Sequence, residues 1–206
     1  MPYSLDLNCI TLQEYRELLK KQNLLPSRRI LFQDVDANFS KIAGQGIGNM
    51  AQLKKALSTP EKLAAFAASS GISEEYLNIL RRETGSLEQK PVPLSHFPGM
   101  DAARVSTLNK EGIKTSKDCW EKQTVQDELY SLCDLVRING VGPMAAKAFF
   151  EAGYTSVADV AQANAEDMLR RISVVNQAKQ YYKAVLGAKD MQFCIDYAKL
   201  LRLYGA

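Results

Sequence analysis

The most informative stretch of the sequence reads Ile138-Asn139-Gly140-Val141-Gly142-Pro143. Two glycines separated by one apolar residue favour a tight turn, because a Cβ atom would obstruct the backbone angles and the close approach that such a turn needs. Pro143 has a fixed φ and no N–H, so it suits the first position of a helix that begins where the turn ends. The stretch therefore predicts a glycine turn that leads directly into a helix.

Another copy of this pattern lies earlier in the chain. Phe97-Pro98-Gly99-Met100-Asp101 is again a turn, and the next glycine pair, Gly112-Ile113, begins eleven residues after Asp101. The corresponding pair, Gly153-Tyr154, begins eleven residues after Gly142. The common register indicates an internal repeat of one supersecondary unit. In this unit, called a helix-hairpin-helix, two helices are joined by a glycine turn.

A fainter third copy lies near the N-terminus. It ends at Gly46-Ile47-Gly48-Asn49, and its turn position, Phe32-Gln33-Asp34-Val35, has no glycine. Leu53 stands in this copy where the other two have Cys119 and Val160. We therefore expect a degenerate unit in this part of the chain.

Helical periodicity dominates the remainder of the chain. Thr11, with Glu14 three residues later, predicts a capping box at a helix start. Thr59 before Pro60 predicts a second helix start, and Ser73 before two glutamates predicts a third. No stretch shows sustained alternation of apolar and β-branched residues between turn signals, so we predict an all-α fold without a sheet.

Helix-breaking residues crowd the segment between Thr84 and Pro98. Gly85, Ser86, Pro91 and Pro93 lie within it, and each proline also restricts the residue before it. We therefore predict an irregular linker. The predicted organisation is an N-terminal helical region with a degenerate helix-hairpin-helix unit (1–84), a Pro-rich linker (85–97) and a tandem helix-hairpin-helix domain (98–206).

The copy around Gly140 and the residues after it resemble a known family. Asp134-Leu135-Val136-Arg137-Ile138-Asn139-Gly140-Val141-Gly142, with Glu151-Ala152-Gly153 and Thr155-Ser156-Val157-Ala158-Asp159-Val160 after it, is similar to the second unit of a microbial domain-of-unknown-function family with tandem helix-hairpin-helix units. The resemblance covers roughly residues 97–203 and is weaker over roughly 30–83. It implies a fold more than an activity. The similarity to DNA-binding helix-hairpin-helix modules at large implies contacts with the phosphate backbone.

The candidate nucleic-acid-binding residues are those of the turns and the cations one helical turn further on. The first N–H groups of a helix have no partner within it, so they form an anion site that suits a phosphate without reading a base. The predicted residues are Gly99, Arg104, Gly140, Gly142 and Lys147. Binding modules of this type commonly place Lys or Arg where this chain has Met144, and Asp101 stands where a second glycine would be, so we expect weak binding.

Composition sets limits on the function. The net charge is +3, with 12 basic and 10 acidic residues in 1–90 and the other 14 and 13 in 91–206, so neither half has the basic surface of a tight nucleic-acid binder. The four cysteines are scattered and have no neighbouring histidine, which favours neither a zinc site nor a disulfide framework. No apolar run is long enough for a membrane span and no export signal is visible, so we expect a cytoplasmic protein without a membrane partner.

No pattern predicts an active site, a metal or a cofactor. Gly44-Gln45-Gly46-Ile47-Gly48 resembles a nucleotide-binding loop, but the segment before it reads as a helix and not as a strand. His96 lacks the marked partners of a catalytic triad, and no catalytic-aspartate loop of the DNA glycosylase type comes after the copy around Gly140. Trp120 and Phe149 have the spacing of core positions rather than of base-stacking platforms.

Two functions remain open from the sequence. The first is a non-catalytic helix-hairpin-helix protein that binds DNA or structured RNA weakly and without sequence specificity, through the phosphate backbone. The alternative is a protein–protein interaction or scaffold module that retains the fold without binding nucleic acid. The balanced charge of the chain also suits this alternative.

Overall fold

The computed structural model describes residues 3–22, 24–122 and 127–205, which form two compact units. The N-terminal unit is Asp6–Glu88, and the C-terminal unit combines Gln89–Ala206 with Met1–Leu5. The segment 85–97, predicted to be a linker, is therefore divided between the two units, and residues 3–5 belong with the C-terminal half of the chain. Local sequence patterns gave no sign of this, because both features depend on contacts between residues distant in sequence.

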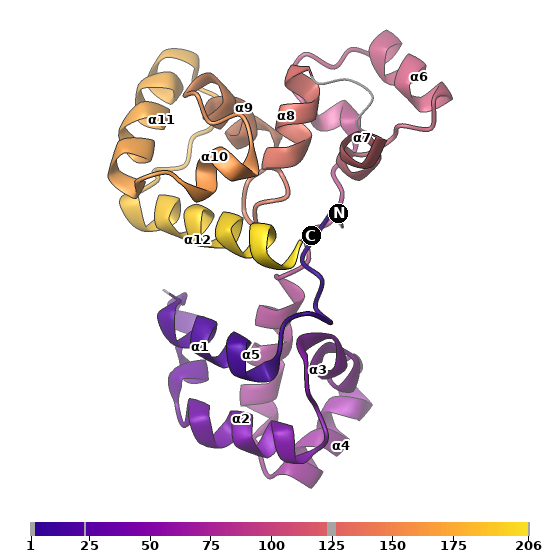
Figure 1. The fold of residues 1–206 in the computed structure, drawn as a ribbon, viewed down its shortest axis with the longest axis vertical. Helices are drawn as coiled ribbons and strands as arrows, with labels where there is room; N and C mark the ends of the chain where they lie inside the picture. Colours follow the sequence, from indigo (N-terminus) through magenta and orange to yellow (C-terminus); the bar gives the residue numbers. More distant parts are fainter. Residues whose placement is uncertain (1–2, 23, 123–126, 206) are drawn as a thin grey trace. The chain divides into compact units, whose positions relative to one another are not determined.

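The N-terminal unit is entirely helical (Figure 1). Its elements are α1 (Leu12–Lys21), the 3-10 helix η1 (Pro26–Phe32), α2 (Val35–Gly44), α3 (Met50–Ala56), α4 (Pro60–Ser70) and α5 (Glu74–Gly85). The predicted helix starts are confirmed, since the side chains of Thr11, Thr59 and Ser73 each accept a backbone N–H of the helix that they precede. Helix α5 contacts α3, α4 and η1, and the leucines that it buries, Leu77 and Leu80, are at the centre of this core.

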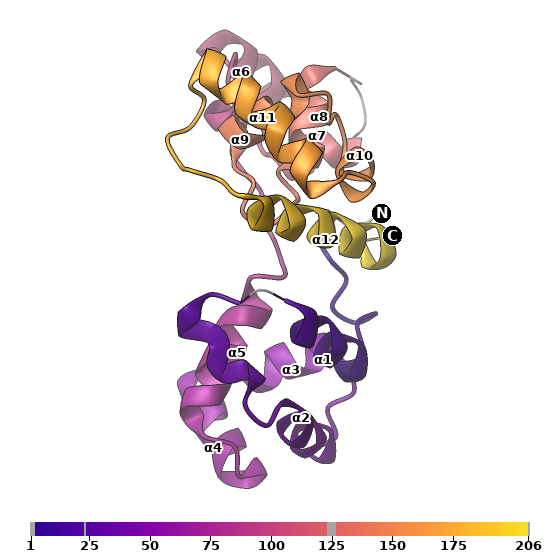
Figure 2. The same ribbon diagram turned by 90° about the vertical axis from the view of Figure 1, so that its left-hand side faces the viewer.

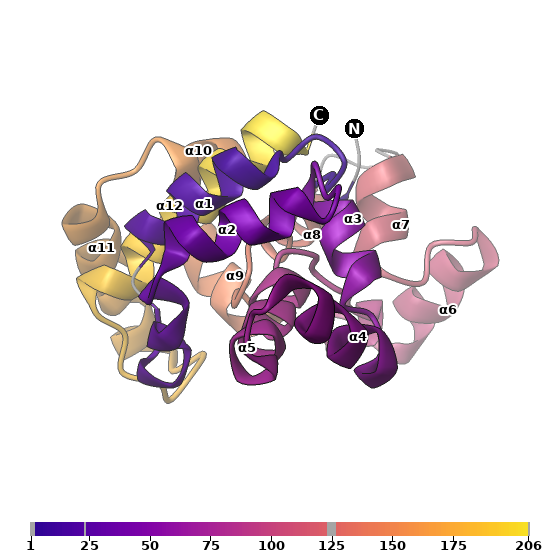
Figure 3. The same ribbon diagram turned by 90° about the horizontal axis from the view of Figure 1, so that it is seen from below.

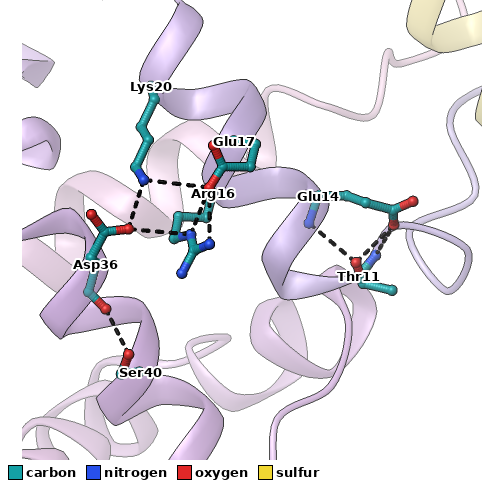
Figure 4. Close-up of polar contacts among 7 residues, drawn as sticks. All are labelled: Thr11, Glu14, Arg16, Glu17, Lys20, Asp36 and Ser40. Carbon is teal, nitrogen blue, oxygen red and sulfur yellow. Dashed lines mark hydrogen bonds and ion pairs between the residues drawn. The ribbon is translucent and has the colours of Figure 1, made fainter.

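Polar contacts hold α1 at its start and against α2 (Figure 4). Thr11 Oγ1 accepts the Glu14 N–H at 3.1 Å, and Glu14 Oε2 accepts the Thr11 N–H at 2.8 Å, which completes the predicted capping box. Asp36 on α2 lies 2.7 Å from Lys20 Nζ and 3.4 Å from Arg16 Nε on α1. The hydrogen bond from Lys20 lowers the pKa of Asp36, because it stabilises the charged form of the carboxylate.

Tyr15 supplies a stability prediction for this unit. Its side chain is buried on α1, and its hydroxyl has no hydrogen-bond partner among the described residues. Burial, with the nearby Glu83 carboxylate, raises the pKa of Tyr15 well above its usual value, so the group remains a neutral hydroxyl. Because an unsatisfied buried hydroxyl costs free energy, Tyr15→Phe should stabilise the chain by about 1 kcal/mol in urea unfolding.

Tyr76→Phe is the matched control, because the Tyr76 hydroxyl is also buried but donates to the Leu31 carbonyl at 3.2 Å. This change should destabilise the chain by about 1 kcal/mol. If Tyr15→Phe were as destabilising as Tyr76→Phe, the Tyr15 hydroxyl would have to be satisfied in solution and the prediction would be wrong.

The C-terminal unit is also helical. Its elements are η2 (Leu94–His96), α6 (Ala102–Lys110), α7 (Ser116–Lys122), α8 (Glu128–Leu135), α9 (Pro143–Glu151), α10 (Val157–Ala161), α11 (Ala165–Lys179) and α12 (Ala188–Tyr204). Helix α12 lies along α10 and α11, as Figures 1 and 2 show. Its inward residues include Met191, Ile195, Ala198 and Leu201, all buried.

The predicted all-α fold is confirmed for the described residues, which contain no strand and only two isolated bridges. One bridge pairs Pro93 with Thr115, and the Leu94 N–H donates to the Lys114 carbonyl at 3.1 Å. The prediction that residues 84–98 are irregular was wrong in part, because α5 continues through Gly85 and η2 forms at Leu94–His96. None of the helices in the described ranges has the length and apolar character that crossing a bilayer requires.

A buried carboxylate organises the centre of the C-terminal unit. Asp134, near the end of α8, accepts hydrogen bonds from Trp120 Nε1 on α7 at 3.0 Å and from the Val157 N–H at the start of α10 at 2.7 Å. It also pairs with the guanidinium of Arg137. Asp134 and Arg137 are 8% and 6% exposed, so two opposite charges are placed together in the interior. A buried charge is tolerated only with such partners.

Arg137 extends this network to the first residues of the chain. Its guanidinium lies 4.0 Å from the centre of the Trp120 ring, and its Nε donates to the Tyr3 carbonyl at 2.8 Å. The Tyr3 hydroxyl is hydrogen-bonded to Ser116 Oγ at 2.6 Å, and this oxygen also accepts the Val92 N–H at 2.9 Å. These contacts explain why residues 3–5 and the segment after residue 88 belong to the C-terminal unit.

Candidate functional site

The second glycine turn, Ile138–Gly142, joins α8 to α9. The Val141 N–H donates to the Ile138 carbonyl at 3.0 Å, and Gly140, which is exposed, has φ +84°. A side chain at Gly140 would therefore be strained, as the sequence predicted. The same reasoning was wrong for Gly142, whose φ of −84° and ψ of 172° any residue can adopt. No atom would clash with a Cβ there.

The first glycine turn, Phe97–Asp101, has the same geometry. Gly99 has φ +77°, and the Met100 N–H donates to the Phe97 carbonyl at 3.3 Å. Asp101 has φ −83° and ψ 169°, which are nearly the angles of Gly142. The carboxylate is therefore accommodated without backbone strain where the other copy has its second glycine.

The two turns differ in what they present at the start of the next helix. Asp101 caps α6 with its own side chain, since its Oδ1 accepts the Arg104 N–H at 2.7 Å. No side chain caps α9, which begins at Gly142 with Pro143 at its first position. The leading N–H groups of a helix lack partners within it, so the α9 start can accept an anion while the α6 start is already occupied by a carboxylate. Met144 is 39% exposed beside the α9 start.

Both predicted cations are held by carboxylates at the start of α8. Lys147 Nζ lies 2.8 Å from Glu128 and 3.2 Å from Glu151, and its side chain is only 16% exposed. Arg104 lies 2.9 Å from Asp127, which precedes Glu128 in the chain. Partial burial lowers the pKa of Lys147, but the hydrogen bonds to the two carboxylates outweigh it and raise the pKa overall. Lys147 is therefore charged, and a phosphate would compete with these carboxylates for it.

A second repeated turn, whose polar contacts were not predicted, occurs three times. Its glycine has positive φ in each copy: Gly46 (+79°), Gly112 (+76°) and Gly153 (+93°). Two residues further on, a backbone N–H donates to the side chain four positions later. The donor and acceptor pairs are Gly48 with Gln52, Lys114 with Asp118, and Thr155 with Asp159.

The helix after each of these turns begins with a side-chain cap. Asn49, Thr115 and Ser156 accept the N–H of Gln52, Asp118 and Asp159, respectively. Burial raises the pKa of Asp118 and of Asp159, but the hydrogen bonds that each carboxylate accepts outweigh it and lower the pKa overall. The signal was present in the sequence as a Ser or Thr cap with Asp three residues later. These polar residues therefore have a structural role.

The remaining candidates lie where a structural role accounts for them. Gly44–Gly48 forms the junction between α2 and α3, and His96 is exposed at the end of η2. Trp120 and Phe149 are buried. In the described ranges no three side chains of the metal-binding types lie close enough together to hold an ion.

Comparison with known proteins gives one finding. A family model described as a domain of unknown function (DUF4332) matches residues 117–201, from α7 into α12. The match includes the second glycine turn and the α9 start but not the first turn or the N-terminal unit. No curated protein and no solved structure matches the chain. The match supports a relationship between that part of the chain and a domain-of-unknown-function family. It assigns no activity to the chain.

Proposed function

We propose that the chain is a non-catalytic protein with tandem helix-hairpin-helix units that binds nucleic acid weakly, through the phosphate backbone and without sequence specificity. The observation that supports this most is the second glycine turn, where exposed Gly140 leads into a helix start that no side chain caps. The nearly equal angles and turn hydrogen bonds of the first glycine turn support a tandem arrangement. The match to the family of unknown function agrees with this proposal without testing it.

The ion pairs make the expected affinity low. A phosphate oxygen at the α9 start would accept backbone N–H groups and attract Lys147, but it would have to draw Lys147 from Glu128 and Glu151. The first turn contributes less, because Asp101 occupies the α6 start and Asp127 holds Arg104. We expect about two to four phosphates to be engaged, so the slope of log affinity against log salt should be about −2 to −4. DNA and structured RNA both offer this backbone.

A titration of the full chain with a labelled duplex at two salt concentrations tests the proposal. Lys147→Gln should weaken binding at low salt about fivefold, because one charge-assisted contact is lost. Glu128→Gln should strengthen binding about threefold, because Lys147 then has one carboxylate fewer beside it. A substitution of Lys147 by Glu is less informative, since it would place three carboxylates together and reduce stability.

Lys199→Gln is the matched control. Lys199 on α12 also pairs with a carboxylate, Asp196 at 3.6 Å, and the change removes the same charge, so duplex affinity should stay within the error of the parent. Two results would contradict the proposal: no duplex binding at the lower salt, or equal affinities for Lys147→Gln, Lys199→Gln and the parent. A slope near about −8 would require a basic surface that this site does not provide.

A second candidate, a protein-interaction module, is favoured by α6. Helix α9 buries Ala146, Ala148 and Phe149, whereas its counterpart α6 buries no residue and lies at the edge of the C-terminal unit (Figures 1 and 3). The apolar side chains of α6, such as Val105, line a hollow beside η2. If the duplex titration shows no binding, this function is the one that remains.

A further inference from the structure

The segment between α11 and α12 is largely exposed and is fixed at both of its ends. Residues 180–187 form no helix, turn or bend, and the segment projects from the side of the C-terminal unit, at the left of Figure 2. At its start, the Tyr182 N–H donates to Asn176 Oδ1 at 3.1 Å, and Asn176 Nδ2 donates to the Tyr182 carbonyl at 3.0 Å. At its end, the Gly187 N–H donates to Asp190 Oδ2 at 2.8 Å. These contacts with the two neighbouring helices hold the segment in place.

The backbone between these two anchors has no hydrogen-bond partner within the described ranges. No described residue donates to a carbonyl of residues 183–186 or accepts one of their N–H groups. Lys183 and Ala184 are exposed, and Val185 is 98% exposed. Unpaired backbone groups in a non-helical segment offer the same template as the edge strand of a sheet, to which another extended chain can add. The tyrosine, valine and leucine side chains of the segment are of the types that favour such pairing.

Lysines without a paired carboxylate accompany this segment. Lys179, Lys183 and Lys189 are exposed, and none of them forms an ion pair with a described residue. The carboxylates beside the segment are engaged elsewhere. Glu151, which accepts a tyrosine hydroxyl of the segment, pairs with a lysine of α9 at 3.2 Å, and Asp190 accepts the backbone N–H at the end of the segment. A partner that complements this surface in charge is therefore acidic.

We propose that residues 183–186 are a docking surface for an extended acidic segment of a partner protein, which adds to them by β-pairing. The peptide backbone of the partner supplies both the acceptors and the donors that this stretch lacks. Its carboxylates pair with Lys179, Lys183 and Lys189. This surface does not depend on the proposed binding of nucleic acid.

Two other occupants complement the segment less well. A second copy of the chain would bring its own three lysines against these three, so like charges would oppose the pairing. A nucleic acid would satisfy the lysines, but its phosphates only accept hydrogen bonds and would leave the carbonyls of residues 183–186 without donors. An acidic peptide meets both requirements.

The test measures how a short fluorescent peptide, in which valine and glutamate alternate, binds the full chain by anisotropy at low salt. We expect binding that weakens as salt is added, because ion pairs contribute to it. Two matched probes separate the contributions. A peptide with glutamine in place of glutamate lacks the charges, and a peptide with every backbone nitrogen methylated keeps the charges but cannot donate backbone hydrogen bonds. Each should bind about tenfold more weakly than the acidic peptide.

Hydrogen exchange and a variant locate the peptide on the segment. In the free chain the amides of residues 183–186 should exchange rapidly, and the acidic peptide should slow their exchange about tenfold, because they become hydrogen-bonded. Lys183→Gln should weaken peptide binding about fivefold, because one ion pair is lost. Lys199→Gln on α12 is the matched control, since Lys199 already pairs with Asp196, and it should leave peptide binding unchanged.

Three results would overturn the proposal: no binding of the acidic peptide by the parent chain, equal binding of the methylated probe, or unchanged exchange at residues 183–186 in the presence of the peptide. A labelled duplex that slows the exchange of these amides when the acidic peptide does not would also overturn it, and would assign the segment to nucleic acid.

Discussion

Asp134→Ala is expected to lower the free energy of unfolding of the C-terminal unit by about 3–5 kcal/mol, because it leaves Arg137 as a buried charge without its partner. The same change removes the acceptor of the Trp120 indole N–H and of the Val157 N–H, so two buried donors also lose their hydrogen bonds. Urea unfolding monitored by circular dichroism measures the effect. The loss should appear as a lower midpoint with an unchanged slope.

The control and the double variant show whether the buried charge is the cause. Asp196→Ala removes an exposed carboxylate of α12 that pairs with Lys199 at 3.6 Å, and it should change stability by less than about 0.5 kcal/mol. Replacing both partners, Asp134→Leu with Arg137→Met, should cost less than Asp134→Ala alone, because no buried charge is left unpaired. A single variant as stable as the parent would mean that Asp134 does not organise this unit.

Leu53→Ala is expected to destabilise the N-terminal unit by about 2–5 kcal/mol. Leu53 lies on α3 with no exposed surface, and truncation removes buried methyl groups and leaves a cavity. It occupies the position that Val160 holds in the copy around Gly140, where the side chain is also fully buried. Val160→Ala should therefore destabilise the C-terminal unit as well, but by less, since fewer atoms are removed.

The matched control for this prediction is Leu25→Ala. Leu25 is 61% exposed in the same unit, so the same chemical change should alter stability by less than about 0.5 kcal/mol. Equal losses for Leu53→Ala and Leu25→Ala in urea unfolding would contradict the assignment of Leu53 to the core.

Features that depend on neighbouring residues could be predicted from the sequence. The all-α class is indicated by apolar periodicity, and the helix starts at Thr11, Thr59 and Ser73 are indicated by caps that act within one helical turn. Gly99 and Gly140 were identified because their positive φ is a local requirement of the turn. The local argument failed at Gly142, where the backbone is extended and its angles are open to any residue.

Features that depend on distant residues were decided by the tertiary structure. Lys147 and Arg104 were predicted as cations near the two glycine turns, but their pairing with Glu128 and Asp127 requires α8 to pack beside α9 and near α6. The contacts of Tyr3 with Ser116 and Arg137 have the same origin. Caps and turns are set by residues a few positions apart, so the sequence alone determines them. Which charges meet depends on how whole helices pack, and no short-range pattern encodes that.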